Sequence, residues 1–286
     1  MAKTRSAAPP RPSAAAATAT ASARISFRSR KIVKTPPAKA KPLAAATVPP
    51  PAPPAPVLPA LSAPGELAAA LRHLAAADPL LSEVIASTDA PAFTSTPSLP
   101  AFHSLARSIL YQQLATSAAA AIYARFLALL PPAADGAVSP AAVLALAAAD
   151  LRAIGVSGRK AAYLHDLAAR FAAGELSESS VAAMGEDALL AQLTRVKGIG
   201  EWTVHMFMIF SLHRPDVLPS GDLGVRKGVQ ELYKLKALPK PEEMATLCER
   251  WRPYRSVGAW YMWRLLESKG AATKKAKKPK KGNASS

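Results

Sequence analysis

The sequence has little of several residue types, and each scarcity excludes a class of protein. Cys248 is the single cysteine in 286 residues, which excludes an internal disulfide, a zinc site built from cysteines and a four-thiolate iron–sulfur cluster. No run of about 18 apolar residues is free of charge and proline, so we expect no membrane span. Strand-like alternation of apolar and polar residues is nearly absent, and we therefore expect an all-α fold.

Acidic residues are missing from both ends of the chain. Residues 1–65 hold ten Lys and Arg and residues 268–286 hold seven, with no Asp or Glu in either segment. These ends account for the whole formal net charge of +17, so residues 66–267 are electrically balanced. Nucleic-acid binding by the middle of the chain must then rest on local geometry, because bulk charge does not favour it.

Both ends, residues 1–65 and 268–286, are predicted to be disordered basic tails. Fourteen of the 27 prolines fall in residues 1–65, where large apolar residues are few, and such a composition cannot offset the entropy lost on folding. The Lys-rich run at residues 274–281 suits nuclear import or loose phosphate contact. An acid-free start rich in Ser, Ala and Arg also fits a transit peptide, so we predict the nucleus, with plastid or mitochondrion as the alternative.

Helix signals fill residues 66–267, which we predict to be one domain of about ten helices. The apolar residues at 161, 164, 167, 168 and 171 share one helix face, and Gly174 follows as a stop. Residues suited to the N-cap precede several apolar-periodic segments. They are Asp78, Thr116, Ser139, Ser157 and Asp187.

A sharp turn joins two of these predicted helices at residues 194–203. One apolar helix ends near Thr194, Gly198 and Gly200 follow, and a second apolar helix begins near Glu201. The glycines let the backbone approach an anion, and the amides at the start of the second helix carry the positive end of its dipole. Taken alone, such a turn is more often an ordinary connection between helices.

The wider sequence resembles a family of DNA repair enzymes. Val-Lys-Gly-Ile-Gly-Glu-Trp-Thr at residues 196–203 resembles the helix-hairpin-helix motif of DNA glycosylases, and Leu-Pro-Ser-Gly-Asp-Leu-Gly-Val-Arg at 218–226 resembles their Gly/Pro-rich loop and catalytic aspartate. Ser-Ile-Leu-Tyr-Gln-Gln-Leu-Ala at 108–115, and Trp-Arg-Pro-Tyr-Arg-Ser at 251–256 followed by Trp260 and Trp263, are similar to signatures of the 3-methyladenine DNA glycosylase II family.

The resemblance spans about residues 100–267. It implies the helix-hairpin-helix glycosylase fold, which has two helical lobes with a cleft, in the compact form without the N-terminal β-rich domain of some bacterial members. It also turns the glycines of the hairpin into a phosphate cradle, in which Gly198 and Gly200 contact DNA and Lys197 is either a phosphate contact or a solvated turn residue.

By the same resemblance Asp222 is the catalytic residue. Positive charge develops on the sugar as the base leaves, and a carboxylate aimed at it lowers the barrier. Asp222 also suits the N-cap of a helix that begins at Leu223, and the two roles are compatible. Whether Asp222 activates water or only stabilises the cation stays open. Bifunctional members carry a Schiff-base lysine where this chain has Trp202, so we expect a monofunctional enzyme that leaves an abasic site.

The target base must leave the stack, and a wedge must fill the hole that it leaves. The resemblance points to Gln113 or Leu114 as the wedge, while Gln112 either contacts DNA or holds the loop through hydrogen bonds to the backbone. Electron-rich rings suit alkylated purines, which carry positive charge. The predicted pocket residues are Trp202, Met206, Tyr254 and Trp263, although a single tryptophan in a helical domain more often packs in the core.

The expected partner is double-stranded DNA that contains alkylated purines of the 3-methyladenine and 7-methylguanine type, and we expect a monomer. No cofactor is required, but related hairpins bind Na or K through backbone carbonyls that match Thr194, Val196 and Ile199. Two alternatives remain: a non-catalytic helix-hairpin-helix module that binds damaged DNA, and a glycosylase for mismatched uracil or thymine.

Overall fold

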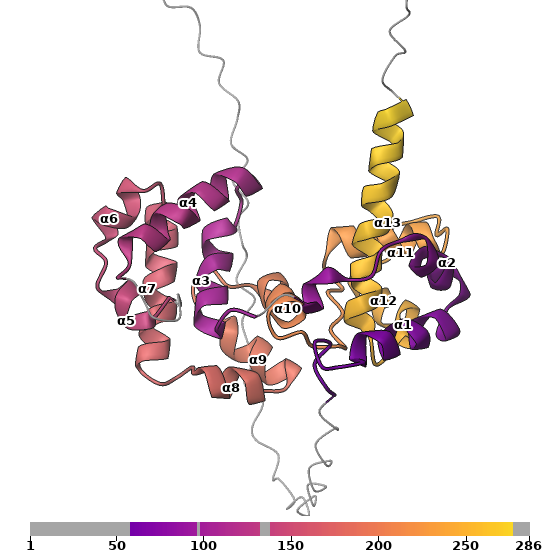
Figure 1. The fold of residues 1–286 in the computed structure, drawn as a ribbon, viewed down its shortest axis with the longest axis horizontal. Helices are drawn as coiled ribbons and strands as arrows, with labels where there is room; N and C mark the ends of the chain where they lie inside the picture. The colour runs from indigo at the N-terminus through magenta and orange to yellow at the C-terminus, as the bar shows by residue number, and fades with distance from the viewer. Residues whose placement is uncertain (1–57, 96–97, 132–137, 277–286) are drawn as a thin grey trace, which may run out of the picture. The chain divides into compact units, whose positions relative to one another are not determined.

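The computed structural model describes residues 58–95, 98–131 and 138–276, with side chains as far as residue 268. Residues 1–57 of the first predicted tail and 277–286 of the second lie outside these residues, and with them the N-terminal candidate targeting segment and most of the Lys-rich run. All regular structure in the described ranges is helical, as predicted (Figure 1). None of the helices described there is both long enough and apolar enough to span a membrane.

The described residues form thirteen α-helices and two short 3-10 helices. In chain order they are α1 (Glu66–Ala77), α2 (Pro79–Ser87), η1 (Ala92–Ser95), α3 (Ala101–Tyr111), α4 (Thr116–Leu129), α5 (Pro140–Leu144), α6 (Ala148–Ala153), α7 (Gly158–Ala172), α8 (Glu178–Ala183), α9 (Glu186–Leu193), α10 (Glu201–Phe210), α11 (Leu223–Leu232), α12 (Pro241–Leu247), η2 (Glu249–Trp251) and α13 (Arg255–Ala276).

Local sequence explains several of these helix starts. Asp78, Ser139 and Ser157 cap α2, α5 and α7 by accepting hydrogen bonds from first-turn amides, as predicted. Two other predicted caps are wrong, because Ala115 precedes α4 and Gly185 precedes α9, and neither makes a side-chain cap. Helix α4 begins one residue earlier than the side-chain signal indicates, at Thr116, and α9 begins two residues earlier, at Glu186.

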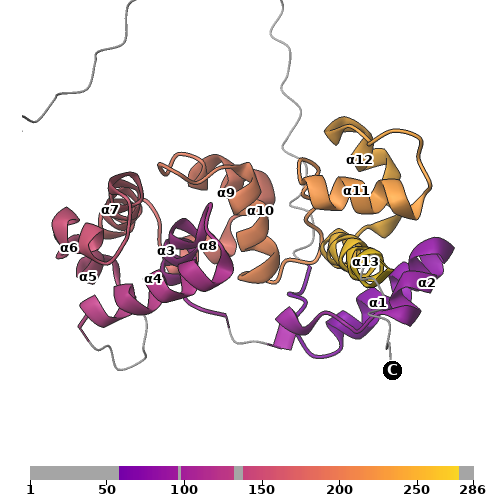
Figure 2. The same ribbon diagram turned by 90° about the horizontal axis from the view of Figure 1, so that it is seen from above.

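The described helices form two groups (Figures 1 and 2). Each group encloses a hydrophobic core. Helices α3 to α10 enclose the first core, which includes Leu110, Leu164 and Ile209. Helices α1, α2 and α11 to α13 enclose the second, in which Trp251 is completely buried. The side chains of Phe93 and Trp263 pack against both cores, so the two lobes meet around them.

The helical domain extends beyond the predicted limits of 66–267. Leu61 is 1% exposed in the second core, and its amide donates to the carbonyl of His213 at 2.8 Å. At the other end, α13 continues to Ala276. The predicted limits followed charge and proline content, which register neither a single buried leucine nor the high helix propensity of Ala and Lys.

Asp78 ties the second lobe together. Its side chain is buried and accepts hydrogen bonds from Tyr233 Oη at 2.5 Å and from Trp251 Nε1 at 2.9 Å. Burial, together with the bond to Asp78, raises the pKa of the Tyr233 hydroxyl. One carboxylate therefore joins the start of α2 to the end of α11 and to η2.

Candidate functional site

The hairpin has the predicted form. Helix α9 ends at Leu193, Gly198 has a φ of 82°, and α10 begins at Glu201 with Gly200 as its N-cap at a φ of −103°. A Cβ added at Gly198 would overlap the ring of Tyr163, whereas a Cβ at Gly200 would have no other atom within 4 Å. Gly198 is thus required by the turn itself, and Gly200 leaves open space outside the backbone.

Some backbone amides of the hairpin donate to acceptors in the protein, and others face solvent. The amide of Lys197 donates to Asp166 Oδ2 at 2.9 Å, and that of Ile199 donates to the carbonyl of Val196 at 3.1 Å. Gly200 provides no side-chain cap, so within the described part of the chain no side chain accepts from the first amides of α10. An anion outside Gly200 therefore faces donors that lack a protein acceptor.

Lys197 and Asp166 form a partial ion pair beneath the turn. The side chain of Lys197 is 70% exposed, with Nζ 3.7 Å from Asp166 Oδ1. Burial acts to raise the pKa of Asp166, but the bonds from the Lys197 amide and from Arg170 outweigh it and lower that pKa. The ammonium of Lys197 still faces solvent, so both predicted roles remain compatible with its position.

The Gln112 segment touches the hairpin directly. Gln112 caps the end of α3, and its Nε2 donates to the carbonyl of Gly198 at 2.9 Å, which is the loop-holding role of the two that the sequence left open. Gln113 is exposed with a φ of 57°, and Leu114 is 39% exposed. Two side chains therefore protrude beside the turn, where the wedge was predicted.

Asp222 is the N-cap of α11, as the sequence suggested. Its Oδ1 accepts from the amide of Val225 at 2.7 Å and from Trp263 Nε1 at 2.9 Å, and its Oδ2 accepts from Trp202 Nε1 at 2.7 Å. The carboxylate thus brings together α10, α11 and α13, and three donors fix its orientation. Its catalytic role stays a prediction.

The loop that carries Asp222 is fastened to α13. Arg255 Nε donates to Asp216 Oδ1 at 2.6 Å, and Ser256 Oγ accepts from the amide of Val217 at 2.9 Å while donating to the carbonyl of Arg214 at 2.6 Å. Sequence reasoning missed these residues, although Arg255 and Ser256 belong to the segment that resembles the family signature.

Gly224 is a further residue that the sequence analysis missed. A Cβ at Gly224 would lie 2.8 Å from Trp263 Cδ1, so a larger residue would push the indole away from Asp222. Its position two residues after Asp222, in the Gly/Pro-rich loop at residues 218–226, was the sequence feature that could have identified it.

Not all four predicted pocket residues gather at Asp222. Trp202 is 54% exposed and Trp263 is half-buried, and both bond to the carboxylate. Met206 is half-buried against the first core. Tyr254 has other partners, because its hydroxyl donates to Glu66 Oε1 at 2.9 Å and its ring meets His73 edge-on at 5.5 Å.

Phe210 was not predicted for the site. Its ring centroid lies 5.8 Å from that of Trp263, and its side chain is 39% exposed. Phe210 follows Trp202 by eight residues on α10, a helical spacing that places both on nearby parts of one face. That periodicity was available in the sequence, whereas the approach of Trp263 required the fold.

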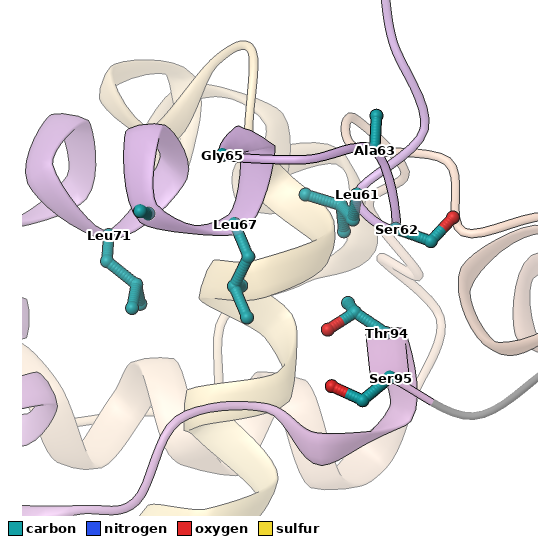
Figure 3. Close-up of a pocket in the computed structure, with 9 residues that line it drawn as sticks. Leu61, Ser62, Ala63, Gly65, Leu67, Leu71, Thr94 and Ser95 are labelled. Carbon is teal, nitrogen blue, oxygen red and sulfur yellow. The ribbon is translucent and has the colours of Figure 1, made fainter.

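An open cavity of about 430 Å³ lies elsewhere, between the start of α1 and η1 (Figure 3). Leu67 and Leu71 point into it from α1, opposite Thr94 and Ser95 of η1. No predicted site residue lines it. Among the described side chains, no three His, Cys, Asp or Glu residues come together in a group that would hold a metal ion.

Comparison with known proteins agrees with this geometry. Residues 106–253 match the family model described as HhH-GPD superfamily base excision DNA repair protein. DNA-3-methyladenine glycosylase 1 of Schizosaccharomyces pombe is 34% identical over 182 residues, which cover 63% of this chain and 78% of that relative. A putative DNA-3-methyladenine glycosylase of Bacillus subtilis is 31% identical over 169 residues, but the match spans only 59% of the relative's length.

Solved structures show the same likeness. The S. pombe 3-methyladenine DNA glycosylase in complex with abasic DNA superposes with a TM-score of 0.58 at 30% identity and covers 68% of this chain and 95% of its own. A DNA-3-methyladenine glycosidase of Bacillus halodurans gives a TM-score of 0.62 at 30% identity and covers 74% and 93%.

Proposed function

The chain belongs to the HhH-GPD superfamily of base excision DNA repair proteins, and from this membership we propose that it is a monofunctional DNA glycosylase for alkylated purines. Its substrates are 3-methyladenine and 7-methylguanine in double-stranded DNA, and its products are the free base and an abasic site. The relatives named above as 3-methyladenine glycosylases support this substrate class.

The observation that carries the proposal is the carboxylate of Asp222 between two indoles. Trp202 and Trp263 donate to opposite oxygens, so the carboxylate is held in one orientation at the start of α11. An alkylated purine carries positive charge and departs readily, which leaves positive charge on the sugar. Asp222 stabilises that charge electrostatically, and water adds to the sugar carbon as the base leaves.

DNA is held by main-chain groups in this proposal. The uncapped amides at the start of α10 bind a backbone phosphate outside Gly200, and Gln113 or Leu114 fills the place of the displaced nucleotide. Trp202 and Trp263 border the extruded base, and Phe210 extends the aromatic surface. The enzyme acts as a monomer, and its destination is the nucleus, with plastid or mitochondrion as the alternative.

Strand cleavage is not part of the reaction. A Schiff base with the sugar needs a nucleophilic amine, and the position that carries it in bifunctional members is Trp202 here. The indole nitrogen cannot act as this nucleophile, because its lone pair belongs to the aromatic ring and its N–H donates a hydrogen bond to Asp222.

A structural Na or K ion at the hairpin belongs to the proposal, and the backbone fits it. In the described part of the chain, neither the Thr194 nor the Ile199 carbonyl accepts a hydrogen bond, and the Val196 carbonyl accepts one from the Ile199 amide and keeps a second lone pair. When bound, the ion would supply positive charge for a DNA phosphate and would take no part in bond cleavage.

The test incubates the protein with duplex DNA methylated by dimethyl sulfate and measures the free bases released. We expect methyladenine and methylguanine, and strands that stay intact until the abasic sites are cleaved by hot alkali. Asp222→Asn should abolish release and keep DNA affinity, since Asn also caps helices and preserves the fold. Binding without release of a base would favour a non-catalytic damage-binding module. Faster release of uracil than of methyladenine, from duplexes that are otherwise the same, would favour a mismatch glycosylase.

A further inference from the structure

Lys160 stands where the local helix does not favour a cation. It lies in the first turn of α7, where the helix dipole opposes positive charge, and burial lowers the pKa of its half-buried ammonium. Nζ donates to the carbonyls of Leu110 and Gln112, both at 2.7 Å. These carbonyls lie at the negative end of α3, which explains why the charge is stable at this place.

The loop held by Lys160 is strained. Gln113 follows the Gln112 carbonyl directly and has a φ of 57°, a left-handed conformation that is unfavourable for a residue with a side chain. Such a conformation persists only where neighbouring contacts fix it. Here Gln112 is fixed twice, at its carbonyl by Lys160 and at its side chain by the Gly198 carbonyl.

The same face of α7 also supports the hairpin. The Tyr163 ring lies against Gly198, where a Cβ would overlap it, and Asp166 accepts the amide of Lys197 at 2.9 Å. Lys160, Tyr163 and Asp166 follow each other at intervals of three residues, so they form one stripe on the helix. This stripe touches both segments that are proposed to meet DNA.

We propose that Lys160 is the positioning residue of the wedge: its ammonium holds Gln113 and Leu114 at a fixed place relative to the phosphate-binding hairpin. The inference rests on the proposed function, because it assigns the wedge to this loop. Lys160 does not touch the reacting atoms. It acts through the Gln112 carbonyl. The wedge residues therefore enter the vacated position in the base stack while the hairpin binds the backbone phosphate.

The test compares Lys160→Met, which keeps the aliphatic stem, with Lys160→Arg, whose guanidinium also donates to two carbonyls. Lys236→Met, at an exposed position in the second lobe, is the matched control for loss of one positive charge. Besides excision, the measurements are the melting temperature, the affinity for undamaged duplex, and the fluorescence of 2-aminopurine placed beside a tetrahydrofuran abasic-site analogue. The last reports insertion of a wedge, and single-turnover excision from methylated duplex is measured in parallel.

We expect Lys160→Met to lower single-turnover excision by between about tenfold and 100-fold, the effect of a small misplacement. The 2-aminopurine signal should fall with it. The melting temperature should also fall, because two hydrogen bonds from a charged group are lost, while affinity for undamaged duplex changes little. Lys160→Arg should restore excision, fluorescence and melting temperature. The Lys236→Met control should behave as wild type.

Three results overturn the inference. One is a Lys160→Met variant with wild-type excision and fluorescence. Another is a parallel loss of affinity for undamaged duplex, which makes Lys160 a phosphate contact. The third is a loss that follows the melting temperature and that Lys160→Arg does not repair. Absence of base release by the wild-type protein defeats the proposed function instead, and the fluorescence assay still decides the role of Lys160.

Discussion

Gln112 Nε2 donates a hydrogen bond to the carbonyl of Gly198 at 2.9 Å, and this bond joins the end of α3 to a turn 86 residues later. The glutamine segment and the hairpin, which sequence reasoning treats as two motifs, are thus one structural unit. The amides outside Gly200 and the exposed Gln113 and Leu114 belong to its surface.

Gln112→Met removes this bond and keeps the length of the side chain. We expect the free energy of unfolding to fall by about 1 kcal/mol, the usual net value of such a bond, and duplex affinity to weaken as the hairpin loosens. Gln230→Met is the control, because Gln230 Nε2 bonds the Leu235 carbonyl at 3.4 Å in the second lobe. Chemical denaturation and fluorescence anisotropy measure both quantities. Equal duplex affinity in the two variants would contradict the prediction.

Trp263→Phe keeps an aromatic ring beside Asp222 but removes the N–H that holds Oδ1. A hydrogen bond to a charged group contributes about 1.5–3 kcal/mol, so we expect single-turnover excision to slow by about 10-fold to 100-fold at unchanged DNA affinity. Trp260→Phe is the matched variant, since Trp260 packs beside the second core. Quench-flow measurement at saturating enzyme compares the excision rates of the two variants. Similar rates would mean that the indole N–H of Trp263 does not contribute to excision.

The parts of this site that could be predicted from sequence are the local ones. Gly198 and Asp222 act through their own turn or helix start, and the structure places them as expected. The roles of Lys160 and Phe210 depend on contacts with residues distant in sequence, which only the fold brings near them. Tyr254 was placed in the pocket because a family signature indicates which segment matters, whereas its partner Glu66 lies 188 residues away on a helix outside the matched region.

Gly198→Ala and Gly200→Ala should have different effects. At Gly198 the φ of 82° and the Tyr163 ring both oppose a side chain, so we expect lower melting temperature and weaker DNA binding. At Gly200 a methyl group meets no protein atom, and the lower entropy of the unfolded chain is offset by the preference for Gly over Ala at an N-cap. Stability should therefore change by less than about 1 kcal/mol. The methyl group would nevertheless separate a phosphate from the backbone. Full DNA affinity in Gly200→Ala would place the phosphate elsewhere.

Glu186, in the first turn of α9, provides a test of pH dependence. Burial, aided by Asp216 and Asp187, raises the pKa of its carboxyl above the ordinary value of 4.5, although Arg255 and Arg214 act to lower it. The folded chain therefore binds more protons than the unfolded chain when the pH lies between 4.5 and the pKa of Glu186 in the folded protein. The contribution of Glu186 to stability is fully present below pH 4.5 and is lost as pH rises through the folded pKa.

Glu186→Gln removes this titration and should melt at a higher temperature than wild type at pH 7, while the two should melt together at pH 4. A domain of this size shifts by about 2–4 °C per kcal/mol, which scanning calorimetry resolves. Glu83→Gln, at an exposed position of α2, should show no such dependence. A Glu186→Gln variant less stable than wild type at pH 7 would contradict the prediction, because attraction to Arg255 and Arg214 would then outweigh the cost of burying the charge.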